Sequence, residues 1–328
     1  MAIPSSTEYI EDIVSTTIRN IRPKVIDNFF KSKALFVRLM EKNRVMLDGG
    51  RQIQQPFLYD APPGGSYGRG DDLDISTKNI LSSMIFDWSR YYSAVTIDGL
   101  DELQNAGAQK IIDLTEVRMN AARMKIEDDI GGDIFLDGTG NGSKNIVGLR
   151  AGIDDGNTVA SYGGITRVVS AAVGTPAYAV NAGYVSTTAA TFTPDIATTA
   201  MGGATVSGER PDLIITTQAI WDRFHDRLQT QQRFPSTSTP GAKGMIDAGF
   251  PAFSWSGAEV VVDQKCPTGF MYFLNTKYIT LYVHSMRNFV VDGPHVPANR
   301  DQRTWRVFFA GCLVIGAPRL QALVSNLT

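Results

Sequence analysis

The 328-residue sequence predicts an α+β protein, and three patterns carry that prediction. Apolar residues recur at helical spacing in the N-terminal part and in residues 105–133, whereas apolar and polar residues alternate in residues 84–97. From residue 211 onward, short apolar runs are interleaved with a helical pattern. Hydrophobic residues make up 43% of the chain, close to the ~45–50% of soluble globular proteins, so a sizeable core can be buried. The length is enough for about two domains.

The first elements follow from these patterns. Apolar residues recur at steps of three and four from Ile10 to Ile18, Pro23 interrupts them, and residues 25–43 form a second helical stretch. Residues 49–59 and 84–99 are strand-like and could pair as a long hairpin, with the glycine-rich residues 61–76 as its tip. The alternation changes phase between the two halves of the second stretch, which predicts a bulge or twist near residues 90–93.

A long helix is expected next, over residues 105–133. Ile112, Met119, Ala122 and Ile126 share one face, and the small side chain of alanine favours close packing of that face against a sheet. Gly131 and its neighbour Gly132 are expected to end the helix.

The stretch from 157 to 208 is poor in charge, with Arg167 and Asp195 as its only charged side chains. It is rich in Ala, Thr, Gly and Val, which favours β-structure, and a surface of that composition is expected to be covered by a partner. A pattern typical of alternating strands and helices follows. Residues 211–229 predict a buried strand and a helix that turns Ile220, Phe224 and Leu228 inward, and residues 234–251 predict a loop. Further strands are expected in residues 258–263, 269–275, 277–283 and 303–316.

Composition excludes several functional classes. The chain has 31 basic and 33 acidic residues, and a net charge of -2 argues against a dedicated nucleic-acid binder. The longest apolar run, residues 308–317, is about half the ~20 residues that a membrane helix needs, and no secretory signal is visible. Cys266 and Cys312 are too few for a disulfide framework and are expected to be buried thiols of a protein made in a reducing cytoplasm.

The glycine-rich stretch "APPGGSYGRGDDLDIS" fails the tests for a phosphate-binding loop. Gly65, Gly68 and Gly70 have the wrong spacing, no Gly-Lys-Ser/Thr follows, and three nearby aspartates would repel phosphate. A divalent metal on Asp71, Asp72 and Asp74 is chemically possible, but a solvated acidic loop is the favoured interpretation.

No catalytic, cofactor or metal motif stands out elsewhere. The stretch that begins at Asp137 mimics a calcium loop, but Gly148 occupies the position of the required bidentate glutamate, so a tight turn is expected. His225, His284 and His295 are isolated from one another and match no catalytic signature. The sequence therefore predicts no enzyme, no cofactor and no bound metal.

Five stretches resemble segments that are typical of one family: "DGGRQIQQPFLYD", "GSYGRGDDLD", "FDWSRYYSAVTIDGLDELQNAG", "FLDGTGNGSKNIVGL" and "VVVDQKCPTGFMYFLNTKYITL". In this order, they are similar to the major capsid proteins of tailed bacteriophages, whose fold is shared with the capsid floor of herpesviruses. The resemblance covers nearly the whole chain. It implies a tailed-phage major capsid fold with an N-terminal arm, an extended β-hairpin loop, a peripheral domain with a spine helix, and an axial α/β domain.

The resemblance assigns these parts to residue ranges: 1–48 to the arm, 49–98 to the extended loop, 99–148 to the peripheral domain with its spine helix, 149–290 to the axial domain, and 291–328 to a return into the peripheral domain. At the tip of the extended loop, Tyr67, Arg69, Asp71 and Asp72 are expected to contact an adjacent subunit.

The implied function is that of a structural subunit of an icosahedral phage head, made of pentamers and hexamers that enclose double-stranded DNA. The short arm implies a separate scaffolding protein, and a portal and non-specific DNA contact are also expected, with assembly in the host cytoplasm and no membrane contact. The alternatives are a tail tube or decoration protein and, from another class, a carbohydrate-active or binding enzyme on an α/β scaffold.

Overall fold

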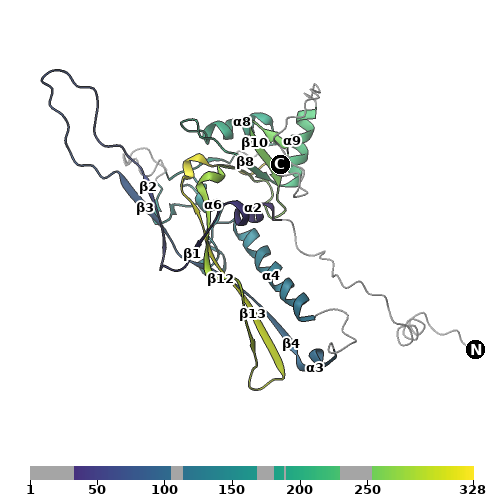
Figure 1. Cartoon of the computed structure of the whole chain (residues 1–328). Coiled ribbons are helices and arrows are strands. Elements are labelled where there is room, and N and C mark those ends of the chain that lie inside the picture. The colour runs from purple at the N-terminus through teal and green to yellow at the C-terminus, as the bar shows by residue number, and fades with distance from the viewer. Residues whose placement is uncertain (1–32, 105–113, 168–180, 188–189, 230–252) are drawn as a thin grey trace, which may run out of the picture.

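The computed structural model describes residues 33–104, 114–167, 181–187, 190–229 and 253–328. The helix predicted for residues 10–18, the position of Ile112 and the loop predicted for residues 234–251 lie outside these ranges. Two sheets organise the described chain, and a separate two-stranded hairpin projects from it (Figure 1).

The elongated sheet has the strand order β1-β12-β13-β4. Its strands are β1 (Arg44–Leu47), β4 (Ser89–Asp98), β12 (Ile279–His295) and β13 (Gln302–Ile315). β12 and β13 form a long antiparallel pair, β4 is antiparallel to β13, and β1 is parallel to β12. The helix α4 (Leu114–Asp133) lies along this sheet and buries Ala122, Ile126 and Ile130 in the core that also holds Val307 and Phe309 (Figure 1). The predicted packing of a long helix on a sheet is therefore confirmed.

The compact sheet has six strands in the order β7-β14-β11-β8-β10-β9. They are β7 (Tyr184–Ser186), β14 (Ala322–Val324), β11 (Met271–Leu274), β8 (Leu213–Thr216), β10 (Ala258–Val262) and β9 (Phe253–Trp255). The helices α8 (Pro194–Gly203) and α9 (Gln218–Gln229) share a second core with this sheet, and Ile220 and Phe224 point inward as predicted. Because β14 belongs to the compact sheet and β13 to the elongated sheet, residues 291–328 contribute to both sheets.

The hairpin predicted between residues 49–59 and 84–99 is confirmed only in part: β2 (Ile53–Leu58) pairs with β3 (Leu81–Phe86) in antiparallel register, whereas residues 89–98 form β4 and pair with β13. The predicted bulge at residues 90–93 is wrong, because β4 pairs with β13 without a register shift. The phase of the alternation changes instead at residues 87–88, where the chain leaves the hairpin for the elongated sheet. Met84 and Phe86 are buried on one side of this break, and Val95 and Ile97 on the other.

Two further boundaries differ from the prediction. The helix α4 continues through both glycines and ends at Asp133, one residue past the predicted stop. Residues 33–47, predicted as part of the arm, are built into the body: α2 (Ala34–Lys42) buries Leu35, Phe36 and Leu39, and β1 joins the elongated sheet.

The charge-poor stretch contains a helix, α8, that was not predicted, together with the short strands β5 (Ser161–Tyr162), β6 (Ile165–Thr166) and β7. Tyr162, Phe192, Ala197 and Ala200 are buried in the two cores of the chain itself. Other described residues of this stretch, such as Thr158, Ser161 and Thr198, are exposed, so its coverage by a partner stays a prediction.

The remaining short elements are α3 (Gly99–Gln104), α5 (Gly140–Ser143), α6 (Leu149–Gly152), η3 (Thr276–Tyr278) and η4 (Pro318–Leu320). None of the helices in the described ranges combines the length and the apolar character needed to cross a bilayer.

Candidate intersubunit surfaces

The segment between β2 and β3, residues 59–80, projects far from both sheets (Figure 1). We call it the tip segment. Residues 64–79 are all exposed, and they include the large apolar side chains of Tyr67, Leu73 and Ile75, the last of which is 91% exposed. Large exposed apolar side chains on a projecting segment can be buried by contact with another molecule. The tip segment is thus a surface that is available to a partner.

Local hydrogen bonds shape the tip segment. At its base, the backbone N–H of Tyr59 donates to the carbonyl of Ile80, and Lys78 Nζ lies 3.2 Å from Asp60 Oδ2. Hydrogen bonds from the N–H of Ala61 and from Lys78 lower the pKa of Asp60, so this carboxylate stays charged at neutral pH. At the far end, Gly70 has a φ of +94°, which glycine adopts without strain.

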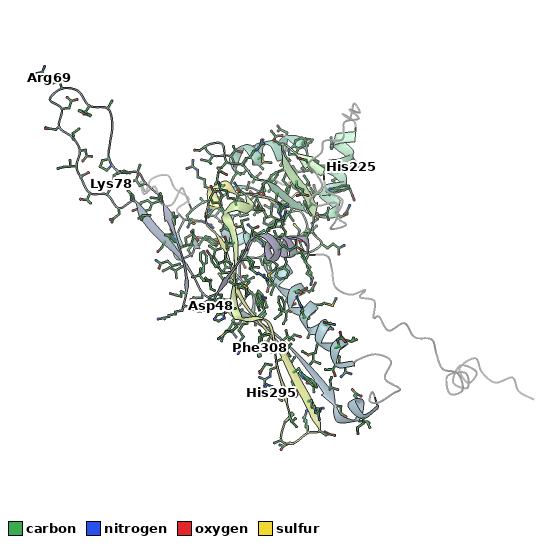
Figure 2. The ribbon with its side chains drawn as sticks, viewed as in Figure 1. Asp48, Arg69, Lys78, His225, His295 and Phe308 are labelled. Carbon is green, nitrogen blue, oxygen red and sulfur yellow. The ribbon has the colours of Figure 1, made fainter. Side chains whose placement is uncertain are left out.

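The four predicted contact residues lie together at the far end of this segment, where Figure 2 places Arg69. Tyr67 is 74% exposed, and Arg69 has no hydrogen-bond or ion-pair partner among the described residues. Asp71 accepts a hydrogen bond from the N–H of Gly68, so it closes a turn in addition to facing solvent. Asp72 is exposed beside it. These residues are therefore accessible to another molecule, and their role in an intersubunit contact stays a prediction.

A second surface lies on the elongated sheet, on the face opposite the buried Val307 and Phe309. Tyr92 and Val290 are directly opposite Phe308 on the two neighbouring strands, so their side chains share this face. Arg287 lies over the Phe308 ring, 4.5 Å from its centroid, and Arg90 and Arg306 are exposed nearby in the register. Tyr92 is 70% exposed. We call this apolar and basic surface the open sheet face; Figure 2 marks Phe308 on it.

The sequence did not indicate the open sheet face. Arg90 and Tyr92 are about two hundred residues from Arg287 and Phe308, and only strand register brings them together. The alternation of exposed and buried residues in β4 and β13 was the one available signal, but it does not identify the neighbouring strand.

A third surface lies at the distal end of the elongated sheet. The N–H of Gly99 donates to the carbonyl of Asp301, which holds the start of α3 beside the turn between β12 and β13. Leu100, Leu103 and Val296 are each more than half exposed there. Like the tip segment, this end presents apolar side chains to its surroundings.

A polar cavity of about 570 Å³ opens between β4 and α4, and Tyr91, Asp129, Asp133 and Lys265 are among its lining residues. Tyr91 Oη donates to Asp133 Oδ2 at 2.8 Å and accepts from the N–H of Ile146 at 2.9 Å. Burial raises the pKa of Asp133 above its usual value, although the hydrogen bond from Tyr91 opposes the rise.

Replacing Asp133 with asparagine should change stability in a pH-dependent way. Because the pKa of Asp133 is higher in the folded state, its favourable contribution is complete below its unfolded pKa and is lost as pH rises through the folded value. Asparagine keeps an acceptor for Tyr91 but cannot ionise. Compared with wild type, Asp133→Asn should therefore be relatively more stable near pH 8 than near pH 4. Urea midpoints at both pH values measure this, and a difference independent of pH would contradict it.

The other candidate groups have structural partners. Asp137 accepts hydrogen bonds from the N–H and hydroxyl of Thr139, so the predicted tight turn is confirmed. His225 stacks on Trp221, and His295 contacts Asp292. Within the described ranges, no three His, Cys, Asp or Glu residues are grouped as metal ligands. Cys266 and Cys312 are free and buried, and burial raises the pKa of both thiols.

Comparison with solved structures identifies the fold. The chain is similar to the capsid asymmetric unit of cyanophage A-1(L), with a TM-score of 0.69 and 15% identity over 96% of this chain and 98% of that one. It is also similar to the capsid of a native GTA particle (TM-score 0.64, 10% identity, 96% and 99% covered). A third similar structure is an encapsulin from Synechococcus elongatus (TM-score 0.61, 9% identity, 100% and 96% covered).

No protein-family model and no curated protein matches the sequence. The chain has the α+β fold of tailed-phage capsid proteins over nearly its full length, as the sequence resemblance predicted.

Proposed function

We propose that this chain is the structural subunit of an icosahedral phage head and that it assembles into pentamers and hexamers around double-stranded DNA. The observation that carries the proposal is the match to phage capsid structures over 96% of the chain, with neither partner of the alignment extending far beyond the other. A subunit of the same length and fold as a capsid protein is suited to the same kind of assembly.

The three exposed surfaces support this proposal. The tip segment, the open sheet face and the distal end lie on different parts of the molecule, and each presents apolar side chains together with charge or hydrogen-bonding groups (Figure 2). In a closed shell, each subunit touches neighbours through different patches, and these heterologous contacts close only by symmetry.

In this assignment, residues N-terminal to Lys33 are the arm, and the hairpin with its tip segment is the extended loop. The helix α4 is the spine helix of a peripheral domain built on the elongated sheet. The compact sheet with α8 and α9 is the axial domain, whose loops would meet around the fivefold and sixfold axes.

The partners of this subunit would be copies of itself, a separate scaffolding protein, a portal and packaged DNA that it contacts without sequence specificity. Its charge of -2 is compatible with such contact, because counterions screen packaged DNA. The location is the virion after assembly in the host cytoplasm. The proposal gives the chain no catalytic role.

Electron microscopy of the protein co-expressed with its scaffolding partner tests the proposal. We expect closed particles with pentameric and hexameric units, and nuclease-protected DNA inside the heads recovered from infected cells. Protein that stays monomeric under all assembly conditions, scaffold included, would overturn it. Long tubes of a single symmetry, or trimers, would favour the tail tube or decoration protein instead.

The likeness to an encapsulin supports one second candidate, a shell that is not a phage head. Closed particles that never hold nuclease-protected DNA would favour that candidate. The same experiment therefore tests separately whether the chain forms a closed shell and whether that shell encloses DNA.

A further inference from the structure

The hairpin formed by β2 and β3 is contacted near its base by a short turn from the charge-poor stretch. The strands β5 and β6 pair in antiparallel register, and the two residues between them, Gly163 and Gly164, have positive φ angles of +59° and +78°. A two-residue turn with this backbone is a tight connection that glycine adopts without strain. The backbone N–H of Ile85 in β3 donates to the carbonyl of Gly163 at 3.0 Å. We call residues 161–166 the bracket.

The contact between the bracket and β3 leaves no room for a side chain. A Cβ added at Gly163 would lie 2.5 Å from the Cβ of Met84, well inside the ~3.5–4.0 Å of an ordinary carbon–carbon contact. Met84 is only 1% exposed, so the core around it opposes any shift. At Gly164, nothing lies within 4 Å of the added atom. The first glycine is therefore required by the hairpin as well as by its own turn, and the second by the turn alone.

The bracket is in turn fixed to the body of the molecule. Tyr162 is 2% exposed, and its Oη accepts a hydrogen bond at 3.0 Å from the N–H of Ile315 at the end of β13. The Tyr162 ring meets that of Phe86 edge to face, with 5.0 Å between the centroids. Arg167, one residue past β6, lies over the same tyrosine ring and donates to two backbone carbonyls of α6. The bracket thus connects the hairpin to both α6 and the elongated sheet.

We propose that the bracket sets the direction in which the hairpin and its tip segment project, with Gly163 as the positioning residue that allows the close contact. The inference rests on the proposed shell function for why that direction matters. It goes beyond that function in naming what positions the hairpin rather than what the hairpin touches. It also gives one described part of the charge-poor stretch a role within the subunit.

The shape of the hairpin explains why its base needs such a contact. A ribbon of only two strands is marginally stable by itself, so its direction depends on what holds it. The 15 residues from Gly70 to Ile85 can span at most about 50 Å, so a tilt of about 10° at the base would move the far end by up to about 9 Å. A hairpin that sampled such tilts would lose more entropy on every contact with another molecule.

The first test measures the direction of the hairpin in the unassembled protein. Spin labels on cysteines introduced at Ser66 in the tip segment and at Ala121 on α4, both exposed positions, report the distance between these two sites. The native Cys266 and Cys312 are buried and their thiol pKa values are raised, so they should not take the label. We expect Gly163→Ala to widen the distribution of this distance about twofold, because the added Cβ pushes β3 off the bracket.

Gly164→Ala is the matched control. It forces an alanine into the same kind of positive-φ backbone as Gly163→Ala does, but its Cβ meets nothing. Its distance distribution should therefore equal that of wild type. Equal distributions in wild type and Gly163→Ala would overturn the proposal. Equal widening by the two variants would overturn it as well, because strain within the turn would then be the cause.

Hydrogen exchange of the wild-type protein gives a second measurement that needs no variant. The Ile85 amide should exchange at least about tenfold more slowly than the amide of Leu73, an exposed residue of the tip segment. Exchange of Ile85 at the rate of Leu73 would overturn the contact, even if Gly163→Ala failed to fold.

Particle yield connects the bracket to the shell function. At equal amounts of folded protein, we expect Gly163→Ala to lower the yield of closed particles by about fivefold or more, because a less ordered hairpin binds more weakly, and Gly164→Ala to leave the yield unchanged. A variant with a widened distribution that still assembles normally would overturn the link between hairpin direction and assembly. If wild type itself forms no particles, the shell function fails, and the distance and exchange measurements still decide whether the bracket positions the hairpin.

Discussion

Replacing Arg167 with leucine is expected to cause a loss of roughly 3–5 kcal/mol in the free energy of unfolding of the monomer, because three buried carbonyls each lose a charged donor. Arg167 is 3% exposed. Its guanidinium donates to the carbonyls of Asn181, Ala151 and Gly152 at 2.6, 2.7 and 2.8 Å. Leucine can fill part of the space but can satisfy none of these acceptors.

Burial lowers the pKa of Arg167, and the nearby Asp154 carboxylate opposes that shift, so the guanidinium stays charged in the folded protein. Its place over the Tyr162 ring, 5.2 Å from the centroid, adds a cation–π contact that leucine also loses. Arg167→Lys keeps the charge but cannot reproduce the planar fork of donors, so it should lie between leucine and wild type.

Urea unfolding measures the effect, with Arg90→Leu as the matched control. Arg90 is exposed on the open sheet face, so its replacement should change the free energy of unfolding by no more than about 0.5 kcal/mol. If the leucine variants of Arg167 and Arg90 unfold at the same midpoint, the three carbonyl contacts do not stabilise the fold as described.

Local sequence patterns predicted those helices and strands whose buried residues recur at a regular spacing along the chain. The inward positions of Ile220 and Phe224 follow from helical spacing, and the packing of α4 follows from its small apolar residues. The sheet to which each strand belongs could not be predicted from local patterns. The phase change before Val95 was attributed to a bulge, although the chain in fact moves from one sheet to another. Alternation reports that one face is buried but not against which strands.

The same distinction applies to the candidate sites: residues that are neighbours in the sequence could be predicted, whereas residues that only the fold brings together could not. Tyr67 and Arg69 could be predicted because they are neighbours in a glycine-rich stretch between two strand-like segments. The capping of α2 by Asp263 could not be predicted, since this residue lies 228 positions from Leu35, whose N–H donates a hydrogen bond to it. The helix α8 was missed because its threonines and glycines disfavour a helix and offset the helix-forming alanines, and its burial against the compact sheet supplies what local propensity lacks.

Replacing Arg69 with glutamate should lower the yield of closed particles by about tenfold or more, because a reversed charge at a contact costs several kcal/mol. The far end of the tip segment would then be uniformly acidic, with the new glutamate beside Asp71, Asp72 and Asp74. The monomer should keep its Tm, since Arg69 has no hydrogen-bond or ion-pair partner among the described residues.

Two matched variants sharpen this experiment. Arg69→Lys keeps the charge and should assemble better than Arg69→Glu, although a planar, two-point contact would be lost. Lys78→Glu reverses a charge at the base of the same segment, where it breaks only the exposed pair with Asp60, a contact that contributes little to stability. Particle yield from electron microscopy and sedimentation would compare the three, and normal particles from Arg69→Glu would contradict the prediction.

The experiment measures particle yield and monomer stability separately. The hydrogen bonds described for the tip segment stay within residues 59–80, and its exposed end lies far from both cores (Figure 2). A substitution there has almost no route to the stability of its own subunit. If assembly fails while the monomer stays folded, the lost free energy must belong to a contact with another molecule. The glycines that allow the segment to turn would then serve its fit to a neighbouring subunit.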